Sequence, residues 1–211
     1  AASDVYKRQQ KAHGEDDAAG ALILNNLAET HFSQDRHALA KRMFKLALKI
    51  LEQTQGPDHP DVAKPLSNLG SLYYTQSNYT QAESLFKKAI AITEKARGAD
   101  HPDLATDLNN LALLYKTKGS PVRAEPLYRR SLAIVEKALG PDHPTVASSL
   151  HNIAVFYFSE GHHAQAEPLL ARALKILHST LGKDHPQVVE VCAKLAIVKE
   201  FLWLDSIVGS G

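Results

Sequence analysis

The strongest constraint on this 211-residue chain is a repeat of 42 residues. The motif Gly-x-Asp-His-Pro occurs four times, at 56–60, 98–102, 140–144 and 182–186. A fixed period of this length is typical of proteins built from stacked units, each of which buries its apolar face against its neighbours. The sequence therefore predicts repeats at 17–58, 59–100, 101–142 and 143–184, then a capping helix or truncated repeat at 185–204 and a tail at 205–211.

The hydrophobic pattern inside one repeat is helical. Val62, Leu66, Leu69 and Tyr73 follow steps of four, three and four, which place them on one stripe of an amphipathic helix. A second helical stripe follows at Ala82, Leu85, Phe86, Ala89, Ile92 and Ala96. Short polar turns separate the two stripes, so each repeat is expected to form two antiparallel helices.

The Gly-x-Asp-His-Pro motif is interpreted as the boundary between successive repeats. Its glycine is expected to end a second helix in the left-handed conformation, and its aspartate is expected to cap the next first helix. Its proline fits the first helical turn, where no N–H donor is needed. The four histidines of the motif are expected to be structural, because at about 10 Å per helix layer they lie roughly 20 Å apart and cannot share an ion.

The order of small and large residues resembles that of the tetratricopeptide repeat. The residues that carry this resemblance are Leu66, Leu69, Gly70, Tyr73, Ala82, Phe86 and Ala89. The 42-residue period, with its NLA-LY, AE-L and DHP markers, is similar to the kinesin light chain variety. The resemblance covers 17–204 and implies an all-α fold, an α-solenoid in which antiparallel helix pairs form a right-handed superhelix. First helices would line the concave side, and small residues such as Gly70 would mark close helix contacts.

The ends of the chain depart from the repeat. Residues 4–9, DVYKRQ, match one reading frame of a common sequencing adaptor, so 1–16 is expected to be a disordered, artefactual N-terminus that replaces the native start. At the other end, 201–204 carries apolar residues suited to a dimer contact. Lys194 stands where the repeats have asparagine.

Composition excludes several classes of protein. Cys192 is the only cysteine, which excludes a disulfide scaffold, and it is expected to be a small buried residue. The net charge of +1 argues against a nucleic-acid partner. Charged residues interrupt the most apolar stretch, 188–208, so no membrane span or membrane partner is expected. The lone cysteine favours a cytoplasmic location.

The candidate site is a ladder of amides on the first helices. Asn26, Asn68, Asn110 and Asn152 recur every 42 residues, and an amide can donate to and accept from the backbone of an extended peptide. The family resemblance implies the same use, because matching asparagines in related grooves hold a peptide backbone. The other predicted groove residues are Asn25, Lys64, Ser67, Ser71, Asn109, Lys116, His151 and Val155. The alternative is that these amides satisfy only each other and neighbouring helix ends.

The charge of the ligand has two interpretations. Lys64 and Lys116 would favour an acidic peptide, but lysines on a helix surface are usually only solvated.

No dinucleotide, phosphate-loop, serine-hydrolase or zinc-protease motif occurs in the sequence, and no histidine or cysteine pair has zinc-site spacing. The sequence therefore predicts no enzyme activity, no cofactor and no metal site.

These observations favour a non-catalytic scaffold that binds a protein or an extended peptide segment in its concave groove. A second hypothesis is a regulatory or sensor repeat array of a larger signalling ATPase or protease. A third is a self-association module that uses the C-terminal helix.

Overall fold

The computed structural model describes the backbone of residues 2–208 and the side chains of residues 17–207. Over this range the chain is all-α, as predicted, with one 3₁₀ helix, η1 (Pro60–Val62), and without strands. The α-helices are α1 (Ala2–Ser33), α2 (His37–Thr54), α3 (Ala63–Thr75), α4 (Tyr79–Arg97), α5 (Leu104–Thr117), α6 (Pro121–Leu139), α7 (Pro144–Ser159), α8 (His163–Leu181) and α9 (Pro186–Val208). They form two compact units, Ala1–Leu114 and Tyr115–Gly211.

The helix bounds differ from the expected segment bounds at both ends. Helix α1 begins at Ala2, so the backbone of 2–16 is helical where the sequence analysis expected disorder. This segment contains two alanines, two lysines, two glutamines, one arginine and one glutamate, which are good helix formers. Helix α9 runs on to Val208, beyond the expected end at 204. Residue 1 and the last three residues of the expected tail lie outside the described residues.

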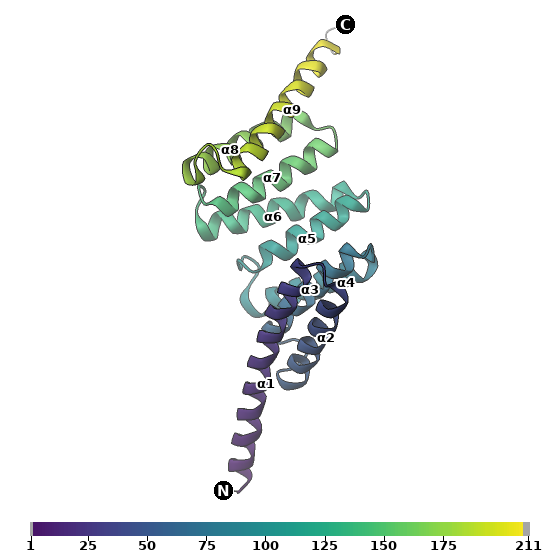
Figure 1. The fold of residues 1–211 in the computed structure, drawn as a ribbon, viewed down its shortest axis with the longest axis vertical. Coiled ribbons are helices and arrows are strands. Elements are labelled where there is room, and N and C mark those ends of the chain that lie inside the picture. Colours follow the sequence, from purple (N-terminus) through teal and green to yellow (C-terminus); the bar gives the residue numbers. More distant parts are fainter. Residues whose placement is uncertain (1, 209–211) are drawn as a thin grey trace. The chain divides into compact units, whose positions relative to one another are not determined.

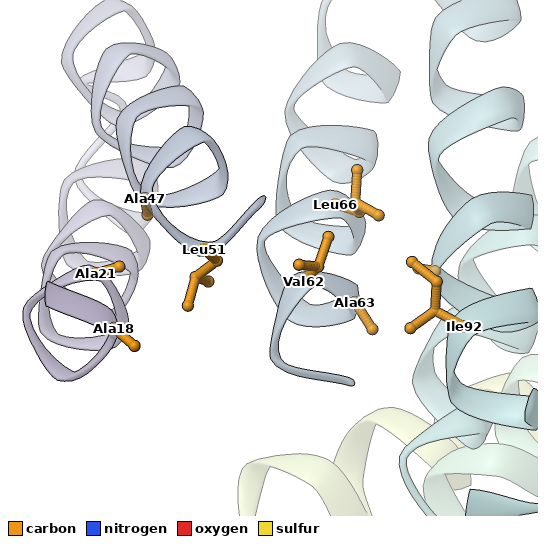
Figure 2. Packing of buried hydrophobic residues seen from close by; sticks show 9 residues of the cluster. Ala18, Ala21, Ala47, Leu51, Val62, Ala63, Leu66 and Ile92 are labelled. Atoms are coloured by element: carbon orange, nitrogen blue, oxygen red, sulfur yellow. The ribbon is translucent and has the colours of Figure 1, made fainter. Parts of the chain in front are cut away.

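Unit 1 contains two consecutive helix pairs, α1 with α2 and α3 with α4 (Figure 1). Apolar residues from all four helices and from η1 meet in one buried cluster, most of which Figure 2 shows. Its members are Ala18, Ala21, Ala47, Leu51, Val62, Ala63, Leu66, Ala89 and Ile92. The first pair thus buries its apolar face against the second pair, as the stacked-repeat interpretation requires.

Unit 2 repeats this arrangement, with α6 on α7, α7 on α8 and α8 on α9. Tyr128 and Phe156 pack with ring centroids 5.6 Å apart in the contact between α6 and α7. Cys192 was expected to be buried, but it is exposed. It lines an apolar groove of about 700 Å³ between α8 and α9, because no described helix covers this side of α9.

A close contact in unit 1 explains the glycine at position 70. A Cβ atom added to Gly70 would lie 2.7 Å from Cε1 of Phe86, whose ring is buried between α3 and α4. The predicted role of this glycine, close helix approach, is confirmed. The equivalent positions Ala28, Ala112 and Ala154 are fully buried small residues.

The glycines of the Gly-x-Asp-His-Pro motif have positive φ, but not the helical left-handed conformation that the sequence analysis expected. Gly98, Gly140 and Gly182 have φ of 93°, 88° and 81° with ψ of 164°, 158° and 163°. This extended region is accessible essentially only to glycine. At this glycine joint the chain therefore leaves the second helix in an extended conformation rather than in a further helical turn.

The cap of the next helix also differs from the expectation. The histidine of the motif, not the aspartate, provides it, because histidine occupies the N-cap position immediately before the proline. In each copy the backbone N–H two residues later donates to the histidine Nδ1 atom. The distances are 3.3 Å at His59, 3.3 Å at His101, 3.2 Å at His143 and 3.3 Å at His185. The motif is structural, as predicted, but its histidine rather than its aspartate caps the next helix.

No helix within residues 2–208 has both the length and the apolar character needed to cross a bilayer.

Removing one histidine cap should destabilise the chain. We expect His143→Ala to lower the free energy of unfolding by about 1 kcal/mol, because the Thr145 N–H loses its acceptor. His143→Asn should restore most of this loss, since asparagine is also a good N-cap residue. Asp142→Ala is the control, and urea denaturation is the measurement. A larger loss for Asp142→Ala than for His143→Ala would contradict this assignment.

Gly70→Ala should be destabilising despite the higher helix propensity of alanine. We expect a loss of about 1–3 kcal/mol, because the added methyl group overlaps the Phe86 ring. Gly20→Ala is the matched control in α1, where a Cβ atom meets nothing within 4 Å. That variant should be more stable by about 0.5–1 kcal/mol. Equal effects in thermal and urea denaturation would refute the close contact.

Candidate functional site

The predicted site residues all lie on the first helices of the repeats, α1, α3, α5 and α7. Asn25 and Asn26 are on α1; Lys64, Ser67, Asn68 and Ser71 on α3; Asn109, Asn110 and Lys116 on α5; His151, Asn152 and Val155 on α7. The side of these helices that carries the residues is called the first-helix face below.

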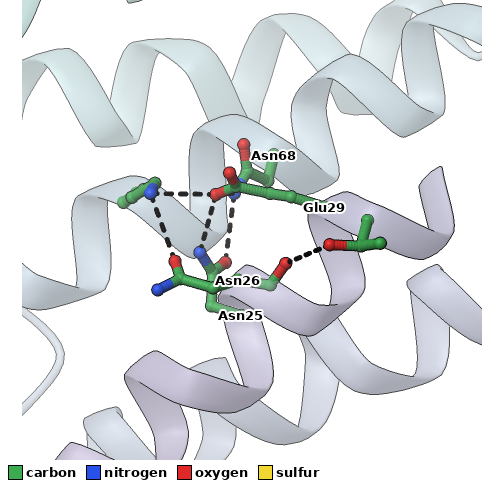
Figure 3. Close-up of polar contacts among 6 residues, drawn as sticks. Asn25, Asn26, Glu29 and Asn68 are labelled. Atoms are coloured by element: carbon green, nitrogen blue, oxygen red, sulfur yellow. Dashed lines mark hydrogen bonds and ion pairs between the residues drawn. The ribbon is translucent and has the colours of Figure 1, made fainter. Parts of the chain in front are cut away.

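A polar network connects α1 and α3 on the first-helix face of unit 1 (Figure 3). Asn68 Nδ2 donates to Asn25 Oδ1 at 3.1 Å and to Glu29 Oε1 at 2.8 Å. Asn25 Nδ2 donates to the same Glu29 oxygen at 2.9 Å. Lys64 Nζ lies 3.0 Å from Glu29 Oε1 and 3.4 Å from Asn26 Oδ1. Glu29, which the sequence analysis did not select, is the centre of this network.

This network shows which ladder amides already have partners. Asn68 uses its nitrogen within the protein, so the alternative interpretation holds for that atom, while its Oδ1 accepts no hydrogen bond from any described residue. Asn110 is half-buried and makes no side-chain hydrogen bond within the described part of the chain. No described residue therefore uses the donors and the acceptor of the Asn110 side chain.

Two of the predicted site residues were expected to be exposed but are buried. Asn25 is 1% exposed and Ser67 is 8% exposed. They occupy equivalent positions, one residue before the ladder asparagine. Each bonds to a side chain of a first helix, Asn25 to Asn68 and Ser67 to Asp107, which explains why this position is turned away from solvent.

The predicted site residues of unit 2 lie beside basic and apolar side chains. Lys194, at the ladder position of α9, donates to His151 Nε2 at 2.8 Å and contacts Glu190 at 2.7 Å. Burial and the adjacent Lys194 lower the pKa of His151, which favours the neutral acceptor form. Burial also lowers the pKa of Lys116. Val155 lines a small apolar cavity of about 210 Å³ with residues of α7, α8 and α9.

Unit 1 has a larger cavity of about 440 Å³ beside the amide network. Lys64, Ser67 and Asn68 line it, and so does Asp107 of α5. Asp107 is only 6% exposed, and Ser67 Oγ donates a hydrogen bond to its Oδ1. Burial raises the pKa of Asp107 from 3.8 to about 6; the Ser67 hydrogen bond opposes this shift and the Asp103 charge adds to it.

Asp107 was not among the site residues predicted from the sequence, although the sequence carries a signal for it. Leu104, Leu108 and Leu111 form the buried stripe of α5, and position 107 falls on the same stripe. A carboxylate at an apolar position predicts either a buried partner or a perturbed pKa.

Comparison with known proteins agrees with the geometry. A family model described as Tetratricopeptide repeat matches residues 21–95, 61–137, 118–179 and 145–202. A crystal structure of BtubC (BKLC) from P. vanneervenii is similar, with a TM-score of 0.76 and 22% identity over 92% of this chain and 84% of that one. A putative kinesin light chain with nearly identical TPR-like repeats from Podosopora anserina has a TM-score of 0.75 and 22% identity over 92% of both chains. No curated protein matches the chain.

The Asp107 carboxyl should make stability depend on pH in an unusual direction. Its pKa is higher in the folded state than in the unfolded state, so its contribution is fully present below about pH 4 and is lost as pH rises through about 6. Between pH 4 and pH 7.5 we expect the free energy of unfolding of Asp107→Asn to rise by about 2–3 kcal/mol relative to that of the natural chain.

Urea denaturation at both pH values measures this gain. Asp142→Asn, which removes an exposed carboxylate, is the control and should show little relative change. A natural chain and an Asp107→Asn variant with parallel pH profiles would contradict the assignment.

Proposed function

Because the chain belongs to the tetratricopeptide repeat family, whose repeats are generally protein-interaction scaffolds, we propose that it is a non-catalytic scaffold that binds an extended peptide. The peptide lies along the first-helix face. Asn68, Asn110 and Asn152 contact its backbone, and neighbouring polar side chains determine selectivity.

The observation that carries this proposal is the unpaired amide of Asn110. A half-buried amide that makes no hydrogen bond among the described residues offers two donors and one acceptor to a ligand. A peptide backbone presents a carbonyl acceptor and an N–H donor at each residue, so it matches this group whatever its side chains. The free Oδ1 of Asn68 supplies a second acceptor for a backbone N–H.

An acidic ligand stays a prediction. The Lys64 ammonium contacts Glu29 and Asn26, so part of its charge is already balanced within the protein. Lys116 is half-buried on α5, where burial favours its neutral form.

A peptide selection followed by one substitution tests the proposal. Random peptides displayed on phage are selected on the purified chain, and the affinity of the best peptide is measured by calorimetry. We expect Asn110→Ala to weaken binding by about tenfold, which is the loss of a hydrogen-bonded contact, with an unchanged melting temperature.

Gln81→Ala is the matched control, because it removes an exposed amide from the second helix α4. Unchanged affinity in the Asn110 variant, or equal losses in both variants, would overturn the proposed use of the first-helix face.

A second candidate function, self-association through α9, is supported by exposed apolar residues. Trp203 is 63% exposed, and Leu204 and Ile207 are about half exposed. Phe201 contributes less, because its ring packs on Phe158 and His163 at centroid distances of 5.3 and 4.9 Å. Sedimentation across a concentration series should show dimers that Trp203→Ser abolishes, and a monomer at every concentration would exclude this function.

A further inference from the structure

The cavity of unit 1 combines an open rim with a closed polar floor. Leu22, Lys64 and Thr106 on its rim are exposed, so the cavity opens toward solvent on the first-helix face. Ser67, Thr93 and Asp107 form its floor and are buried. A side chain that extends from a peptide on this face would therefore reach buried polar atoms.

Two oxygen-bearing groups on the floor have unused hydrogen-bonding capacity. Asp107 accepts from Ser67 through Oδ1, and its Oδ2 has no partner among the described residues. The Thr93 hydroxyl is 4% exposed and makes no hydrogen bond in the same part of the chain. Neither oxygen is among the fully buried side-chain atoms without a partner, so both stay accessible to a donor that enters the cavity.

The charges around the cavity favour a positively charged donor. Two cations, Lys64 and Arg97, and three carboxylates, Asp61, Asp103 and Asp107, line it. Lys64 pairs with Glu29 at 3.0 Å, and Arg97 pairs with Asp103. Asp61 lies beside His59, with Oδ2 3.7 Å from Nδ1. Asp107 makes no ion pair with any described residue, so it is the buried carboxylate that a ligand cation can still neutralise.

We infer that this cavity binds the basic side chain of an arginine or lysine in the peptide, whose head group pairs with Asp107 and donates to Thr93. This inference rests on the proposed peptide-binding function and names one element of its selectivity. It also gives a role to a carboxyl that is buried without a positive partner among the described residues.

Small probes test the cavity without any peptide selection. N-acetyl-arginine amide, N-acetyl-lysine amide and the neutral isostere N-acetyl-citrulline amide are titrated into the ¹⁵N-labelled chain at pH 7.5. We expect the two cations to shift amide resonances in 63–67, 93 and 103–107, and citrulline to bind about 10- to 100-fold more weakly. Lowering the pH to 5 should weaken cation binding by about tenfold, because the Asp107 carboxyl takes up its proton near pH 6.

Two variants make the result decisive. Asp107→Asn should fold and lose about 10- to 100-fold in affinity for the arginine probe, and Thr93→Val should lose several-fold. Asp142→Asn is the control and should bind as the natural chain does. Equal binding of arginine and citrulline, or undiminished binding by Asp107→Asn, would overturn the inference.

The outcomes also separate this inference from the proposed function. Selected peptides that need Asn110 but contain no basic residue would support the scaffold and refute the cationic cavity. Arginine probe binding at Asp107 in a chain that selects no peptide would support the cavity and refute the scaffold proposal.

Discussion

The burial of apolar helix faces between successive pairs is the interaction on which the rest of the structure depends. In unit 1 the contact between α1, α2 and the next pair consists largely of alanines with a few branched residues. Small residues let helices approach closely, as Gly70 does against Phe86 within the pair of α3 and α4. In unit 1 this packing holds α1 beside α3, so that Asn25 and Asn68 meet on the first-helix face.

Polar groups on that face divide into two roles. Asn25, Glu29 and Asn68 bond to each other and fix α1 relative to α3. Asn110, by contrast, has an amide without a partner among the described residues, and the Oδ2 atom of Asp107 also has none. Groups without a partner inside the protein are open to a ligand, whereas the network atoms are already satisfied.

The repeat period and the apolar stripes were sufficient to predict the helix pairs and their order, and the family resemblance added the close helix contact at Gly70. Local polar chemistry was less predictable, because it depends on which side chain reaches which backbone atom. His143 and Asp142 are adjacent and both suit an N-cap, and only the backbone conformation selects the histidine. Glu29 and Asp107 were missed because their roles come from contacts with another helix, 39 and 40 residues away in sequence.

The glycine joints have a consequence for engineering this chain. The conformations of Gly98, Gly140 and Gly182 agree within 12° in φ and 6° in ψ, while the residue before each ladder asparagine changes from Asn25 to Ser67, Asn109 and His151. Backbone geometry and the polar side chains of the first helices are therefore encoded at separate positions. A 42-residue segment can be treated as an interchangeable cassette: recombining cassettes at the joint glycine should diversify recognition while retaining the architecture.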